Sequence, residues 1–393
     1  MATILERPFA TYAQPRAASR TETFAWHAYA VVAAATMIVT GMIWDISWHM
    51  SIGRDTFWTP AHMLIQGGGL LAGLSSGVVA LHTTFRGTPQ AKASAVWFWG
   101  FRAPLGAWVA ILGCGAMLTS APFDDWWHNA YGLDVRIISP PHILLGLGMM
   151  GIVLGAMLRT LALQNSEDEV LRRRAALMFA LSSGLFLSIL AILLMDWSAR
   201  TRMHSGSFYK ALSMTLPVVL VATAVAGRSR WPATTAAAIY MIVFGGTSWI
   251  LMLFPAVPKL GPIYRDISHY IPLDFPLLLV IPAFAIDLTW RRVRSWRPVL
   301  AAIPLGAVFV LTLLVTQWPF ASFLMTHGRN WFFHIDNFVY WMPVAWEANA
   351  YHFRASSSGL LGLPGEMVIA YTYAMIASFV GVLRGQWMTR VRR

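Results

Sequence analysis

Residues 44–62 read WDISWHMSIGRDTFWTPAH and join two long apolar runs of the chain. The stretch holds a carboxylate, two imidazoles, an Arg-Asp pair and three tryptophans. The runs on either side, 26–46 and 60–83, are each long enough to cross the hydrocarbon core of a bilayer as a helix, which takes about 20 apolar residues. The stretch therefore predicts a hairpin of two membrane helices whose polar connection lies at a membrane surface.

Apolar residues dominate the whole chain. Of its 393 residues, 57% are hydrophobic and 12% are charged, whereas a soluble domain carries about 25% charged residues. The net charge is +12, but the basic residues sit in short connections between apolar runs, which is the positive-inside pattern and argues against a nucleic-acid partner. The single cysteine, Cys114, excludes an intramolecular disulfide and a thiolate cluster. We expect a multi-pass protein of the lipid bilayer.

The apolar runs define the expected fold. Ten of them are long enough to span: 26–46, 60–83, 97–120, 140–163, 172–196, 208–226, 232–254, 271–290, 298–323 and 365–386. In lipid such segments must be helices, because a lone helix satisfies its own backbone hydrogen bonds. The sequence thus predicts an all-α polytopic helical bundle with about ten transmembrane helices. The alternation of basic connections places both termini in the cytoplasm and residues 44–62 on the outer face.

Three side chains of the first hairpin form a candidate metal site. Asp45 and His49 are four residues apart, so they share one face of a helix. His62 follows Pro60 by two residues, which suits the first turn of the second helix. The hairpin would bring the three together, and one carboxylate with two imidazoles suits copper, zinc or iron.

A second stretch, residues 123–142, repeats this design as FDDWWHNAYGLDVRIISPPH. Asp124 and His128 are again four apart, and His142 directly follows two prolines. A lone histidine at a helix end is more often an interfacial hydrogen-bonding residue, and an Asp-His pair could also serve as a proton relay. Because the whole pattern occurs twice, metal binding is the favoured interpretation.

Several residues around the first triad occur in a specific order: Trp48-His49, Arg54-Asp55-Thr56, Thr59-Pro60 and His62. This order resembles the C-type subunit of the copper membrane monooxygenases, the particulate methane and ammonia monooxygenases, in which an Asp-x3-His-x12-His motif binds copper. The resemblance implies that Asp45, His49 and His62 are the ligands of one copper ion. It extends over about residues 26–165.

The second triad resembles the neighbouring site of that family. That site has the motif Asn-x3-His-x13-His, with an acidic residue directly after the Asn. Asp124, His128 and His142 occupy those positions, and Asp125 takes the place of the adjacent acid. Aspartate thus stands where the family has asparagine. An anionic ligand would bind a divalent ion more tightly and would shift its redox potential.

The rest of the chain bears a weaker resemblance to the A-type subunit of the same family, a membrane scaffold. The residues that carry it are Tyr270-Ile-Pro-Leu-Asp-Phe, Ile281-Pro282, Asp287 and Gln317-Trp318-Pro319. We therefore expect a cytoplasmic segment at 1–25, a C-like region at 26–200, and an A-like region at 201–393 with a long outer aromatic loop at 324–364. The resemblance further implies a bacterial inner membrane, metal sites on the periplasmic side, and an oligomer, for example a trimer, with other membrane subunits, one of which has periplasmic copper domains.

Taken with the triads, the resemblance implies a copper-dependent oxidoreductase. One or two copper ions would activate dioxygen to oxidise a small hydrophobic or gaseous substrate such as an alkane, an alkene or ammonia, with zinc as the alternative occupant. Four neighbouring residues are candidates for orienting the ligands: Arg54, Asp55, Asp125 and Asp134. Two other functions stay open, a non-catalytic protein that handles copper or zinc and a structural component of a membrane complex.

Overall fold

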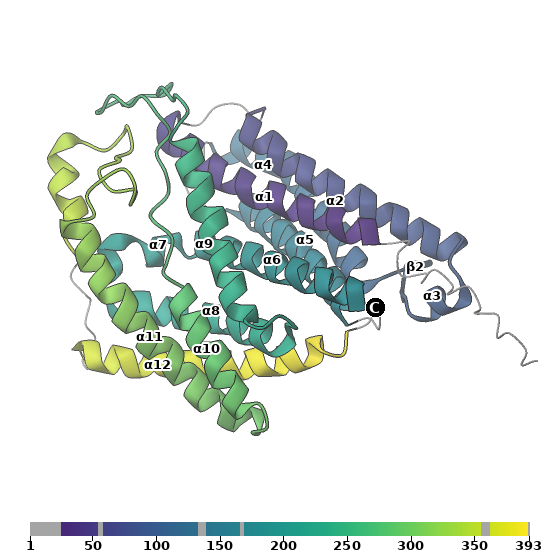
Figure 1. Cartoon of the computed structure of the whole chain (residues 1–393). Coiled ribbons are helices and arrows are strands. Elements are labelled where there is room, and N and C mark those ends of the chain that lie inside the picture. The colour runs from purple at the N-terminus through teal and green to yellow at the C-terminus, as the bar shows by residue number, and fades with distance from the viewer. Residues whose placement is uncertain (1–24, 54–57, 133–138, 166–168, 355–361, 392–393) are drawn as a thin grey trace, which may run out of the picture.

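The computed structural model describes residues 25–53, 58–132, 139–165, 169–354 and 362–391. These residues form an all-α bundle (Figure 1). Nine helices of the described part are long and apolar enough to cross a membrane: α1 (Ala25–Ser51), α2 (Pro60–Phe85), α4 (Leu105–Tyr131), α5 (Pro140–Gln164), α6 (Glu169–Leu193), α8 (Gly206–Ala226), α9 (Pro232–Leu251), α11 (Pro298–Thr326) and α12 (Gly362–Met388). The chain is a polytopic helical membrane protein, as its composition predicts.

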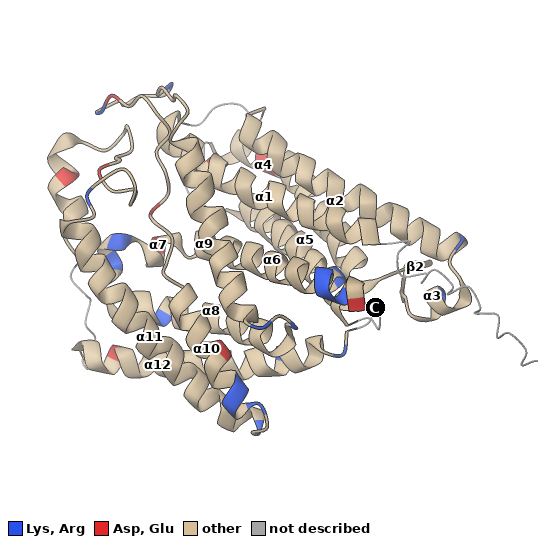
Figure 2. Cartoon of the chain, viewed as in Figure 1, with Lys and Arg blue, Asp and Glu red and all other residues tan. Residues whose placement is uncertain are grey.

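The remaining elements are short and lie in the connections. They are α3 (Pro89–Ala93), β1 (Val96–Phe98), β2 (Phe101–Ala103), α7 (Met195–Ser198), η2 (Arg200–Arg202), α10 (Val280–Val293) and η3 (Val344–Tyr351). β1 and β2 pair antiparallel, with Val96 opposite Ala103. Figure 2 shows charged residues mainly at helix ends and in connections, and few along the membrane-length helices.

Helices α1, α2, α4 and α5 form one closed group, in which α1 contacts α2 and α5, and α4 contacts the same two helices. The α4–α5 pair is held close by glycines. A Cβ atom on Gly113 would lie 2.6 Å from the carbonyl oxygen of Gly148, and one on Gly148 would lie 2.7 Å from that of Gly113. Gly106 and Gly155 are in the same reciprocal relation. Small residues thus let the two backbones approach.

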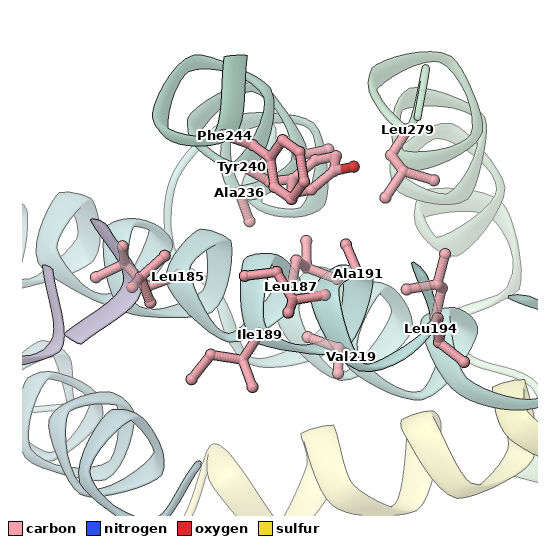
Figure 3. Close-up of a cluster of buried hydrophobic side chains, with 14 of the residues drawn as sticks. Leu185, Leu187, Ile189, Ala191, Leu194, Val219, Ala236, Tyr240, Phe244 and Leu279 are labelled. Atoms are coloured by element: carbon pink, nitrogen blue, oxygen red, sulfur yellow. The ribbon is translucent and has the colours of Figure 1, made fainter. Parts of the chain in front are cut away.

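The other helices join this group through α6, which contacts α1, α5 and α9, and through α9, which also contacts α1. α12 lies against α8 and α11, and α10 lies against α9 and α11. Figure 3 shows part of the apolar core between α6, α8 and α9. Leu185, Leu187 and Ile189 of α6 are almost fully buried there, together with Tyr240 of α9.

Two expected spans differ in the structure. In the first, expected at 97–120, residues 96–103 form the β1–β2 hairpin, and α4 begins at Leu105 and ends at Tyr131. The second is the span expected at 271–290. Residues 271–279 are not helical, and the helix after them, α10, begins at Val280 and ends at Val293. Pro272 and Pro276 explain the difference, because proline lacks the backbone N–H group and its ring clashes with the preceding helical turn. The segment is nevertheless buried at Ile271, Leu273, Leu277 and Leu279.

Side chains from other elements satisfy the backbone of this buried segment. Ser51 Oγ accepts a hydrogen bond from the Ile271 amide at 2.7 Å, and Ser47 Oγ donates to the Ile271 carbonyl at 2.6 Å. Further along, the Leu277 amide donates to the Tyr240 hydroxyl at 3.0 Å. Gln317 Oε1 accepts a hydrogen bond from the Leu278 amide, and His334 Nδ1 donates one to the Leu273 carbonyl. Non-helical backbone at membrane depth is tolerated where protein buries it, and the contacts of Ser47 and Ser51 also fix the C-terminal end of α1.

Candidate metal centre

The first triad lies where α1 ends and α2 begins. Asp45 Oδ1 lies 3.7 Å from His49 Nε2 and 3.0 Å from His62 Nε2, and one ligand atom from each of the three residues falls within 4.8 Å of the others. Thr59 positions His62, because its side chain accepts a hydrogen bond from the His62 amide at 3.2 Å and so caps α2. The hairpin thus brings together the three residues that the spacing singles out.

The second triad has the same construction at the junction of α4 and α5. Asp124 Oδ1 lies 3.2 Å from His128 Nε2 and 3.6 Å from His142 Nε2. In both triads, therefore, one carboxylate oxygen faces the Nε2 atoms of two histidines, one from its own helix and one from the next. Among the described residues, the first triad alone has all three ligand atoms within 4.8 Å of one another.

The carboxylate-to-imidazole distances fit a shared ion in both triads, whereas the two histidine nitrogens of the second triad lie more than 4.8 Å apart and would have to approach each other to bind one ion. Two ligands that are each about 2.1 Å from one ion can lie at most about 4.2 Å apart, and all four carboxylate-to-imidazole distances, 3.0 to 3.7 Å, are shorter. The Oδ1 atoms of Asp45 and Asp124 are buried, and neither accepts a hydrogen bond within the described part of the chain. A buried anionic oxygen is costly unless a positive charge faces it, and either a proton on a facing imidazole or a bound metal ion would compensate it.

Two polar groups beside the second triad orient its histidines, and we did not expect either from the sequence. His128 Nδ1 lies 3.1 Å from the carbonyl oxygen of Gly132, so Nδ1 carries the proton and Nε2 carries the lone pair in neutral imidazole. That lone pair faces the carboxylate of Asp124. Two lone pairs at 3.2 Å repel each other unless a proton or a metal ion lies between them. The other group is Ser139, whose Oγ lies 2.9 Å from His142 Nδ1.

The sequence carries a signal at Gly132 and at Ser139, but each signal indicates only a helix end. Gly132 directly follows α4 and has a φ of 83°, which suits glycine at a helix end. Ser139 precedes a proline-started helix, where a serine would be expected to cap the backbone. Its side chain makes no capping bond and contacts the His142 ring instead.

The four residues expected to orient the ligands divide into two groups. Arg54, Asp55 and Asp134 lie outside the described residues. Asp125 is exposed, and its carboxylate accepts a hydrogen bond from Asn129 Nδ2 at 3.3 Å. Asp125 therefore contacts Asn129 on the exposed side of α4.

Three aromatic residues of α4 are close to the second triad in the sequence and contact one another. Trp127 and Tyr131 have ring centroids 4.5 Å apart, and Trp126 contacts both of them. Tryptophan and tyrosine favour the headgroup zone of a bilayer. The triads themselves are partly open: the side chains of His49 and His142 are 39% and 35% exposed. An ion or a small molecule could thus reach either triad from the aqueous side.

Comparison with protein-family models, with curated proteins and with solved structures finds no significant match to this chain. The function of the chain is therefore inferred from the chemistry of the triads and from the resemblance of their motifs.

Proposed function

We propose that this chain is the metal-bearing subunit of a copper-dependent membrane monooxygenase that oxidises a small hydrophobic or gaseous substrate, such as an alkane, an alkene or ammonia. The observation that carries the proposal is the repeated arrangement of one buried carboxylate oxygen facing two imidazole Nε2 atoms. One such arrangement is compatible with a hydrogen-bonded histidine pair. Two, each at a helix junction with a proline-started second helix, favour a built metal-binding unit.

The donor set is suited to a redox-active ion. Imidazole and carboxylate bind copper, iron and zinc, and at a given site copper(II) is bound most tightly of the divalent series. When bound, copper would supply the one-electron chemistry that dioxygen requires. The protein residues have separate tasks: His49 and His62 would hold the ion by Nε2, and Asp45 would add the negative charge that favours its oxidised form. Asp124, His128 and His142 would act in the same way.

The membrane setting supports the proposed placement. The arginines at the start of α6 and at the end of α10 lie at the opposite end of the bundle from the triads, as the path of the chain dictates (Figure 2). By the positive-inside rule, that end faces the cytoplasm and the triads face the periplasm of a bacterial inner membrane. The motif resemblance adds further membrane subunits, one with periplasmic copper domains, and an oligomer such as a trimer.

A second candidate function is non-catalytic handling of copper or zinc. The exposure of His49 and His142, 39% and 35% of their side chains, favours it, since a site that exchanges its ion with another protein must be accessible. The two functions share the same ligands. They differ in the fate of the bound ion, which either reacts with dioxygen in place or passes to another protein.

The deciding experiment is a metal analysis by mass spectrometry, covering copper, zinc and iron, on the protein purified in native-like lipid. Wild type is compared with His49→Ala, His128→Ala and the control His352→Ala, which changes an exposed histidine of the 324–364 loop. We expect one equivalent of copper for each triad, the loss of one equivalent in each triad variant, and no loss in the control.

Activity then separates the two functions. In membranes that contain the partner subunits and a reductant, a monooxygenase converts propene to its epoxide with dioxygen, and His49→Ala or His128→Ala abolishes the conversion. Copper binding with unchanged propene conversion in both variants would favour metal handling. Copper content that neither substitution alters would refute both functions.

A further inference from the structure

A cavity of about 490 Å³ adjoins α1 at Met50, the residue that follows His49. It lies between the C-terminal end of α6, the middle of α9, the short α7–η2 segment and the non-helical residues 273–277. Its volume is within the range of about 300–1,000 Å³ that is common for small-molecule sites. The two metal triads do not explain it, since none of their six ligands lines it.

The floor of the cavity is apolar. Ala191 of α6, Tyr240 and Phe244 of α9, and Leu277 line it, and Figure 3 shows Ala191, Tyr240 and Phe244 around the core from which the floor is built. The Tyr240 hydroxyl already accepts a hydrogen bond from the Leu277 amide. The floor therefore offers an incoming molecule contact with hydrocarbon and aromatic surface.

The mouth of the cavity is charged, with two arginines and two aspartates among its lining residues. Asp274 is paired with Arg200, whose Nη1 lies 3.6 Å from Oδ1 and whose amide donates to Oδ2 at 3.2 Å. Arg202 and Arg354 also line the cavity, and neither has an ion-pair partner among the described residues. The Nε atom of Arg202 is buried and lacks a hydrogen-bond partner in the same part of the chain.

The remaining charges favour a negative ligand. Asp196 lines the same mouth. Among the described residues, the lining therefore has two arginines without an ion pair, Arg202 and Arg354, and one carboxylate without an ion pair, Asp196. Arg354 is held beside Arg202 because its amide donates to the carbonyl of Thr201 at 2.8 Å. Guanidinium groups bind carboxylate and phosphate through paired N–H donors.

We propose that this cavity binds an amphipathic ligand with an anionic head and an alkyl chain. Arg202 and Arg354 hold the carboxylate or phosphate head, and the chain lies against Tyr240 and Phe244. The position of the cavity at the outer, C-terminal end of α6 gives such a ligand access from the outer leaflet. The head could belong to a free fatty acid or to an acidic phospholipid.

Native mass spectrometry of the intact protein in detergent tests the charge preference. Dodecanoate and dodecyltrimethylammonium have the same chain and opposite charge, so equal concentrations of the two isolate the effect of the head. We expect the wild type to retain dodecanoate in preference to dodecyltrimethylammonium. Arg202→Gln and Arg354→Gln should each weaken dodecanoate retention about tenfold, because each removes one charge-assisted hydrogen bond. Asp196→Asn should strengthen dodecanoate retention, because it removes a like charge.

Arg294→Gln is the matched control, since it removes an exposed arginine of the α10–α11 connection and should change nothing. Arg354 is exposed as well, so its variant reports on the site even if Arg202→Gln fails to fold. Equal retention of the two amphiphiles, dodecanoate retention that survives Arg354→Gln, or weaker retention in Asp196→Asn would overturn the proposal.

A third ligand identifies the source of the head. Dilauroyl phosphatidylglycerol carries the same chains on a phosphate head, and the wild type is offered it together with dodecanoate. Preferential retention of the phospholipid that is lost in Arg354→Gln supports an acidic lipid as the ligand. Preferential retention of dodecanoate that is lost in that variant supports a free fatty acid.

Discussion

Ser139 Oγ lies 2.9 Å from Nδ1 of His142. This contact turns the Nε2 atom of the same ring towards the carboxylate of Asp124, 3.6 Å away. In the first hairpin, Thr59 occupies the corresponding place before the proline, but its hydroxyl caps the His62 amide. The two hairpins therefore share a sequence design and use its hydroxyl group differently.

We predict that Ser139→Ala weakens copper binding at the second triad about tenfold or more, since groups that orient a ligating histidine contribute roughly 10–100-fold to metal affinity. The measurement is competition with a chromophoric chelator in the His49→Ala background, so that the second triad alone reports. Thr59→Ala in the His128→Ala background is the counterpart, and it should act mainly through helix stability, at about 1 kcal/mol. Unchanged affinity in Ser139→Ala would show that the hydroxyl does not orient the ring.

The close approach of α4 and α5 gives a second prediction. Gly148→Val would force a side chain to within 2.7 Å of the Gly113 carbonyl oxygen, so we expect a large drop in thermal stability and loss of metal at the second triad. Gly146→Val is the control on the same helix, because a Cβ atom there meets nothing within 4 Å. Thermal unfolding in detergent and metal content per chain are the two readouts. Equal behaviour of the two variants would contradict the packing argument.

The buried non-helical segment gives a third prediction. Ser51→Ala leaves the Ile271 amide without its acceptor, which should cost about 1–3 kcal/mol and speed hydrogen exchange of that amide. Ser94→Ala is the control, since Ser94 is exposed and its hydroxyl bonds within its own turn. Hydrogen exchange followed by mass spectrometry resolves the peptide that contains Ile271. Exchange as slow as in wild type would mean that another group takes the role of Ser51.

His334 gives a prediction on pH. It lies in the connection after α11, and burial lowers its pKa from 6.5 to about 4, opposed by its hydrogen bond to the Leu273 carbonyl and by Asp274. In the unfolded chain this histidine takes up a proton near its ordinary pKa of about 6.5. The folded protein therefore keeps its full stability above that pH and loses stability as the pH falls from about 6.5 towards 4, where the loss levels off.

His334→Asn isolates this effect. Asparagine tolerates the φ of 59° at this position and can donate to the Leu273 carbonyl, but it does not titrate. Unfolding midpoints measured between about pH 7 and pH 4.5 should fall less steeply in the variant than in wild type. The triad histidines are the same in both proteins, so they do not contribute to the difference between the two profiles. Parallel pH profiles would rule out His334 as a source of acid sensitivity.

Local features of the chain are enough to predict the helices and the triads. Apolar runs of membrane length can only be helices in lipid, and the spacing of Asp45 and His49 places both on one helical face. A proline two residues before His62 or His142 marks the first turn of the next helix. Because each hairpin is built from neighbouring segments, its two ends meet without help from the rest of the fold.

Contacts between distant segments account for the rest. In the expected span at 271–290, Pro272 and Pro276 interrupt the helix, but the non-helical segment can be buried only because Ser51, Tyr240 and Gln317 bond its backbone amides. The cavity mouth likewise joins Arg202 to Arg354, which lie far apart in the chain. Spacing rules reach a few residues in either direction, so hydrogen bonds and charges that meet only after the bundle has packed are beyond them.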